Sequence, residues 1–154
     1  MKNFFFSPRY YFNGPGAVGI FILRVFLGFA LASHGQGKIM NPFNWMGPDV
    51  PGIFQALAAF SEFFGGLAIM FGVLTPLACL GVMSTMFVAI LSHIMRGDAY
   101  FVAPSGVKDA NSYENAAVYF FFALTIFLIG PGLLSVDAAL TKMLGKRGAA
   151  TPTP

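Results

Sequence analysis

Two histidines, a lysine and a glutamate stand at the ends of apolar segments, where they could do chemistry together. His34 and Lys38 close the first apolar segment, His93 closes the third and Glu114 opens the fourth. If each segment crosses a bilayer, these three ends lie on the same side of it. Two imidazoles and a carboxylate can hold a metal, and two imidazoles can ligate a haem. The same set can donate hydrogen bonds to the carbonyls of a quinone head group and pass protons to it.

The local spacing favours the quinone over a metal or a haem. The chain contains no HxxxH, ExxH or CxxC pattern, so no short motif supplies two ligands from one segment. Phenylalanine-rich segments, together with Met83, Met86 and Met95, would suit a quinone ring and its tail. The plainer alternative is that each histidine is an interfacial residue bonded to a loop, and that the Met and Phe residues serve packing or lipid contact.

Two more charged residues fall inside apolar segments. Arg24 is about eight residues into the first segment, roughly 12 Å at helical rise. Glu62 is about nine residues into the second segment from the opposite side, roughly 14 Å deep. Each unpaired charge would cost several kcal/mol in such surroundings, so we expect an Arg24–Glu62 ion pair. The pair could equally be a packing device without chemistry, since Gly28, Gly65 and Gly66 would let the two helices approach closely.

These residues must be positioned by membrane-spanning helices. Hydrophobic residues make up 56% of the 154-residue chain and charged residues 10%, against about 25% charged in soluble proteins. Apolar segments long enough to cross a bilayer run over about 17–35, 53–74, 76–94 and 114–129. The sequence therefore predicts one domain over 1–154, an all-α four-transmembrane-helix bundle.

The segments outside the spans predict how the chain lies in the membrane. The head, with "FFFSPRYYF", and an amphipathic segment over about 133–145 suit the membrane interface. Lysines and arginines are more numerous near the termini than in the long loops. The positive-inside rule then predicts cytoplasmic termini, and we expect a bacterial inner-membrane protein. The net charge of +3 is dispersed, which predicts no nucleic-acid partner.

The chain resembles the DoxX family of small four-span membrane proteins over about residues 16–140. The resemblance rests on Arg24, "HGQGK" at 34–38, "SEFFGGLAIMFGVLTPLA" at 61–78, His93, Glu114 and "GPGLLSVD" at 130–137. It implies a four-helix bundle and a link to respiratory and sulfur redox chemistry. Relatives include subunits of a thiosulfate:quinone oxidoreductase and membrane partners of superoxide-detoxifying and thiol-handling proteins. The family supplies no agreed set of catalytic residues.

Two functional hypotheses follow. In the first, the chain is a membrane subunit of a quinone-linked redox system. Arg24 and Glu62 then form a buried anchor, and His34, Lys38, His93 and Glu114 line a polar pocket near the non-cytoplasmic face. In the second, the chain is a non-catalytic structural or assembly subunit that packs against other membrane subunits or against itself. The aromatic head and the loop over 96–113 would then be its contact surfaces.

Overall fold

The computed structural model describes residues 13–99 and 112–148, with side chains described up to Met143. Its helices are α2 (Pro15–Ile39), α3 (Gly52–Phe71), α4 (Thr75–Met95), α5 (Glu114–Ile129) and α6 (Val136–Gly148). In the described residues the only β pairing is an isolated bridge between Ala99 and Ser112. The predicted all-α fold is confirmed. The aromatic head and most of the loop over 96–113 lie outside the described residues.

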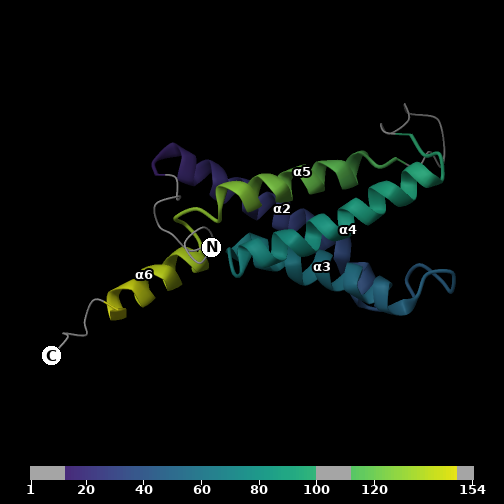
Figure 1. The fold of residues 1–154 in the computed structure, drawn as a ribbon, viewed down its shortest axis with the longest axis horizontal. Coiled ribbons are helices and arrows are strands. Elements are labelled where there is room, and N and C mark those ends of the chain that lie inside the picture. Colours follow the sequence, from purple (N-terminus) through teal and green to yellow (C-terminus); the bar gives the residue numbers. More distant parts are fainter. Residues whose placement is uncertain (1–12, 100–111, 149–154) are drawn as a thin grey trace.

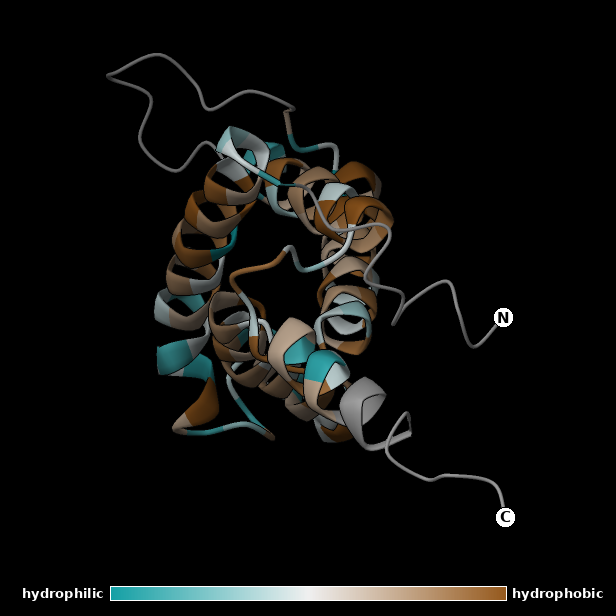
Figure 2. Cartoon of the chain, turned by 90° about the vertical axis from the view of Figure 1, so that its left-hand side faces the viewer, coloured by the Kyte–Doolittle hydropathy of each residue, from teal (hydrophilic) through white to brown (hydrophobic). Residues whose placement is uncertain are grey.

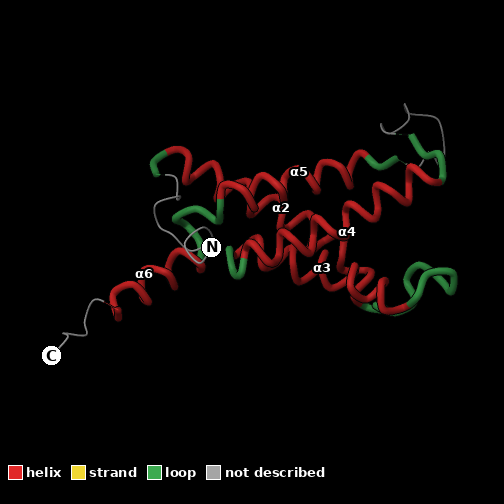
Figure 3. Tube along the Cα trace, in the orientation of Figure 1, coloured by secondary structure: helices red, strands yellow, loops and turns green. Residues whose placement is uncertain are grey.

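Helices α2 to α5 run antiparallel to one another in chain order and form a bundle (Figures 1 and 3). Helix α2 packs along α3, α3 along α4 and α4 along α5, whereas α2 and α5 touch far less. The bundle has two ends. The loop end carries residues 40–51 and the end of α4, and the junction end carries the turn 72–74 and the loop 130–135. Helix α6 leaves from the junction end.

The helix boundaries follow from proline and glycine. Pro15 occupies the first turn of α2, where its missing N–H costs nothing. Helix α3 ends at Phe71 and is capped by Gly72, which has a φ of 69°, a left-handed conformation that glycine adopts without strain. Pro76 lies in the first turn of α4. The sequence "HGQGK" stays helical, so α2 continues to Ile39 and keeps His34 and Lys38 one turn apart.

The bundle has the lengths and surface of a membrane protein. Helices α2, α3 and α4 are long and apolar enough to cross a membrane, and α5 is a shorter apolar helix of 16 residues, about 24 Å in length. Many large apolar side chains point outward, among them Phe26 with 71% of its area exposed and Phe29 with 64%. Figure 2 shows the mainly hydrophobic colouring of the bundle helices. This surface contacts the lipid bilayer.

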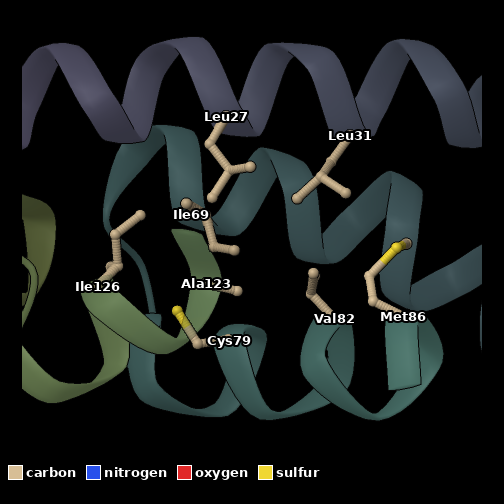
Figure 4. Packing of buried hydrophobic residues seen from close by; sticks show 8 residues of the cluster. All are labelled: Leu27, Leu31, Ile69, Cys79, Val82, Met86, Ala123 and Ile126. Carbon is tan, nitrogen blue, oxygen red and sulfur yellow. The ribbon is translucent and has the colours of Figure 1, made fainter. Parts of the chain in front are cut away.

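A small core joins the four bundle helices. Figure 4 shows how side chains from all four meet: Leu27, Leu31, Ile69, Cys79, Val82, Met86, Ala123 and Ile126. Glycine sets the closest approach, which is between α2 and α3. A Cβ atom on Gly28 would lie 2.5 Å from the carbonyl oxygen of Gly66, and one on Gly35 would lie 2.6 Å from the amide nitrogen of Phe63. These contacts fix the register of α2 against α3.

Candidate functional site

An ion pair between Lys38 and Glu62 lies between α2 and α3, toward the loop end. The Nζ atom of Lys38 is 2.5 Å from Oε2 of Glu62, and the side chain of Glu62 is 3% exposed. The register explains the pairing. Gly35 packs against Glu62 and Phe63, and Lys38 is three residues further along α2, on the same face. The long lysine side chain reaches back to the carboxylate.

The loop between α2 and α3 covers this ion pair with an aromatic ring. The ring centroid of Trp45 is 4.5 Å from Nζ of Lys38, a cation–π geometry. The indole Nε1–H donates a hydrogen bond to the carbonyl oxygen of Gln55 at 2.9 Å. The ammonium of Lys38 therefore lies between a carboxylate and an indole face.

Gln55 organises that loop. Its side chain is buried. Oε1 accepts a hydrogen bond from the amide of Met46 at 2.7 Å, and Nε2 donates to the carbonyl oxygens of Gly47 at 2.8 Å and Val50 at 2.7 Å. One side chain thus holds three backbone groups of the loop that carries Trp45. These bonds fix the position of the indole above Lys38.

The predicted Arg24–Glu62 ion pair is wrong, because each residue has other partners. Arg24 lies at the junction end, where Nη1 donates to the carbonyl oxygen of Pro131 and Nη2 to that of Leu134, both at 2.7 Å. It is eleven residues before Gly35, the α2 residue that packs on Glu62. That separation is about 16 Å along a helix, too far for an arginine side chain to reach. Arg24 therefore joins α2 to the loop before α6.

The other predicted pocket residues have separate surroundings. His34 is exposed, and its ring centroid is 6.3 Å from that of Tyr119 on α5. Nδ1 of His93 is 2.8 Å from Oδ2 of Asp98, which also accepts a hydrogen bond from Nε of Arg96 at 3.3 Å. Lys38 therefore pairs with Glu62, which the sequence analysis had assigned to Arg24 and not to the pocket. His93 pairs with Asp98 in the loop that follows its own helix.

Glu114 begins α5, and its amide donates a hydrogen bond to the hydroxyl of Ser112 at 3.1 Å. A local contact of this kind suits the start of a helix, where amide groups lack helical partners. Because α5 begins where α2 and α4 end, Glu114 lies at the same end of the bundle as Lys38 and His93. No group of three His, Cys, Asp or Glu residues among the described positions could hold a metal ion.

Sequence reasoning missed three residues of this end, namely Trp45, Gln55 and Asp98. Tryptophan is common at membrane interfaces, but the contact of Trp45 with Lys38 joins residues seven positions apart, and their spacing in the sequence does not predict it. Gln55 is a polar residue within an apolar segment, the same signal that identified Glu62. Asp98 is five residues after His93, and the turn at the end of the helix brings the two side chains together.

Comparisons with known proteins agree with this architecture. A family model described as DoxX matches residues 19–95, which span most of α2 and all of α3 and α4. The inner membrane protein YqjF of Escherichia coli (strain K12) is 31% identical over 132 residues, which cover 81% of this chain and 94% of that protein. No solved structure matches the chain. With a membrane-spanning bundle, a matching family model and a relative similar over nearly its whole length, the chain belongs to the DoxX family.

Proposed function

We propose that this DoxX-family protein is a membrane subunit of a quinone-linked redox system and that its quinone pocket lies at the loop end. The observation that carries the proposal is the Lys38–Glu62 ion pair beneath Trp45. Charged groups inside a spanning segment are costly and usually mark a functional site. Here an ammonium, a carboxylate and an aromatic face lie together in a protein whose apolar surface contacts lipid, and a quinone dissolves in lipid.

These groups match the chemistry of a quinone head group. Reduction of a quinone to a quinol takes up two electrons and two protons, and a partner redox protein would supply the electrons. Lys38 can donate a hydrogen bond to a quinone carbonyl and polarise it. Glu62, paired with Lys38, can hold or release a proton. The indole of Trp45 offers a face against which a flat ring stacks.

The remaining predicted residues would carry protons between this pair and water. His34 is exposed one helical turn before Lys38, and an imidazole has two ring nitrogens that can accept or donate a proton. His93 is held by Asp98, an arrangement that orients the ring and leaves Nε2 as the second site for a proton. Glu114 would serve as a third proton carrier at the start of α5.

The proposal is tested by whether the purified chain retains a quinone. The chain is extracted in a mild detergent from native membranes, and its bound quinone is measured by chromatography. The double variant Lys38→Met with Glu62→Leu removes both charges without leaving one unpaired. We expect quinone with the wild-type chain and with the control Lys142→Gln, which lies at the opposite end, and its loss from a double variant that remains folded.

Two results would contradict the proposal. One is a wild-type chain that carries no quinone when it leaves native membranes and binds none that is added. The other is a folded double variant that retains as much quinone as the wild type. Since protein yield and monodispersity are measured on the same samples, loss of the fold is distinguished from loss of the ligand.

A second candidate function, a non-catalytic structural subunit, is favoured by one surface. An open groove of about 400 Å³ follows the outer side of α3 and α4. It is lined by the small residues Ser61, Gly65, Ala68, Ala78 and Gly81, together with Phe60, Phe64, Leu74 and Leu77. Small residues on a lipid-facing surface let another transmembrane helix approach closely. A partner subunit or a second copy of the chain would then occupy the groove.

This alternative makes a different prediction for one variant. Ala68→Leu fills the groove without touching the Lys38–Glu62 pair. If the chain is a structural subunit, native gels of membrane extracts should show it released from its larger assembly. If the quinone pocket is its function, the same variant should keep its bound quinone. Measuring both on Ala68→Leu separates the two functions.

A further inference from the structure

Helix α6 is attached to the bundle by a hydrogen-bonded junction. The amide of Asp137 donates to the carbonyl oxygen of Gly72 at 2.8 Å. The carboxylate of Asp137 in turn accepts from the amides of Leu74 and Thr75, both at 2.8 Å. These amides begin α4, so Asp137 acts as the N-terminal cap that α4 lacks from its own sequence. The first turn of α6 is thereby bonded to the turn between α3 and α4.

A second set of bonds holds the loop that leads into α6. Arg24 is 1% exposed and donates to the carbonyl oxygens of Pro131 and Leu134. The hydroxyl of Ser135 donates to the carbonyl oxygen of Gly132 at 2.7 Å and accepts from the amide of Ala138 at 3.1 Å. The path of the chain from α5 into α6 is therefore determined at several consecutive positions. The direction in which α6 leaves the bundle is set by the bundle itself.

One exposed side of α6 is apolar. In its first turn the acidic Asp137 is buried and Val136 is 41% exposed. Leu140 and Met143 follow at helical spacing and are 49% and 61% exposed, so the three share one face. No helix packs along α6 within the described part of the chain. Water would be a poor solvent for this stripe of Val136, Leu140 and Met143.

The chain that leads from the bundle to the stripe also exposes apolar side chains. Leu128, near the end of α5, is 60% exposed, and Leu133 and Leu134 in the following loop are 43% and 52% exposed. Exposed apolar side chains therefore occur at the end of α5, in the loop that follows it and on α6. Figure 2 shows hydrophobic and hydrophilic colours side by side on α6.

Basic residues accompany the stripe. Lys142 is exposed, and Lys146 and Arg147 follow in the sequence of the same helix. A helix with an apolar stripe and adjacent lysines binds at the surface of a membrane that contains anionic lipids. From these observations we propose that α6 is a lipid-binding helix: its stripe enters the acyl boundary, and Lys142 binds anionic phospholipid headgroups.

The proposal is tested on the full chain in lipid nanodiscs. Cys79 is buried, so a single cysteine introduced by Met143→Cys can carry an environment-sensitive fluorophore. Lipids with a spin label near the headgroup then report contact by quenching. Leu77→Cys, on the exposed side of α4, gives the reference for lipid contact, and Asp49→Cys, in the loop 40–51, gives the reference for water.

The expected result has two parts. The fluorophore at position 143 is quenched by the labelled lipid in discs that contain phosphatidylglycerol, as strongly as at position 77. The amount of phosphatidylglycerol needed for half-maximal quenching rises about fivefold in Lys142→Gln, the loss expected for one basic residue at an anionic surface. Salt raises that amount further in the wild type, because it screens exposed charges.

Three results would overturn the proposal. Water-like emission at position 143 in every lipid mixture, equal to that at position 49, would mean that α6 stays in solution. A shielded fluorophore that lipid quenchers do not reach would mean that a protein covers the stripe. Equal quenching with and without phosphatidylglycerol, unchanged by Lys142→Gln, would mean that Lys142 binds no headgroup.

Discussion

Lys38 and Glu62 form the charged contact of the candidate site, and their energetic coupling can be measured. Glu62→Gln should lower the free energy of unfolding by about 3–5 kcal/mol, because Lys38 keeps its charge without a buried partner. Lys38→Met should be costly for the same reason. The double variant Lys38→Met with Glu62→Leu should recover much of the loss. Thermal unfolding in detergent, arranged as a double-mutant cycle, gives the coupling energy.

The control for this cycle is the pair Arg24 and Glu62, for which the sequence predicted an ion pair. Arg24→Met and Glu62→Leu should act independently, since Arg24 bonds to the carbonyl oxygens of Pro131 and Leu134. Their losses should add to within about 0.5 kcal/mol, as for distant sites. Additive losses for Lys38 and Glu62, or strong coupling of Arg24 with Glu62, would contradict the arrangement.

Among the elements, α2 and α3 depend on close contact at glycine. A side chain at Gly28 would collide with Gly66 and Met70, whereas Gly19, on the same helix, has open space around it. Gly28→Val should therefore separate the helices and lower stability by about 1–3 kcal/mol or more, the usual cost of overpacking. Gly19→Val is the matched control, with a small effect. Equal melting temperatures for the two variants would show that the helices do not meet at Gly28.

The junction between α3, α4 and α6 contains a second sensitive glycine. Gly72 has a φ of 69°, and a Cβ atom there would collide with the guanidinium of Arg24 and the Cβ of Ser135. Gly97 has a φ of 77° with nothing within 4 Å of its Cβ position. Both Gly→Ala changes cost about 1–3 kcal/mol of backbone strain.

Only Gly72→Ala must also displace Arg24, so its melting temperature should fall well below that of Gly97→Ala. The difference between the two variants isolates the collision from the strain that both share. A loss of stability no greater in Gly72→Ala than in Gly97→Ala would mean that Arg24 does not occupy the space above Gly72.

For the molecule as a whole, the orientation in the membrane is the property to test. We predict that the junction end faces the cytoplasm, because the segments before α2 and after α5 carry more lysine and arginine than the loops of the opposite end. In intact cells a membrane-impermeant thiol reagent should label Asp49→Cys and leave Asn13→Cys unlabelled. Both positions are exposed and Cys79 is buried, so the labelling reports side alone. The opposite pattern would reverse the orientation and the side of the candidate site.

The sequence by itself determined the fold class and the family. High hydrophobic content, few charges and segments of spanning length are compatible with little except a bundle of membrane helices, because every backbone polar group must be bonded within such a segment. The order of Arg24, "HGQGK", Glu62 and "GPGLLSVD" was enough to suggest the DoxX family. It also marked Glu62 and Arg24 as residues that need partners, since a charge in hydrocarbon is costly wherever it lies.

Only the tertiary structure decided which partners they have. Depth counted from predicted helix ends placed Arg24 and Glu62 at overlapping levels, but the register is set by contacts of Gly28, Gly35 and Gly66. That register places Gly35 against Glu62, so that the carboxylate of Glu62 forms its ion pair with Lys38. It leaves Arg24 at the junction end, bonded to carbonyl groups more than a hundred residues away in the chain. Periodicity and composition describe one helix at a time, and the relative sliding of two helices depends on side-chain packing that neither pattern contains.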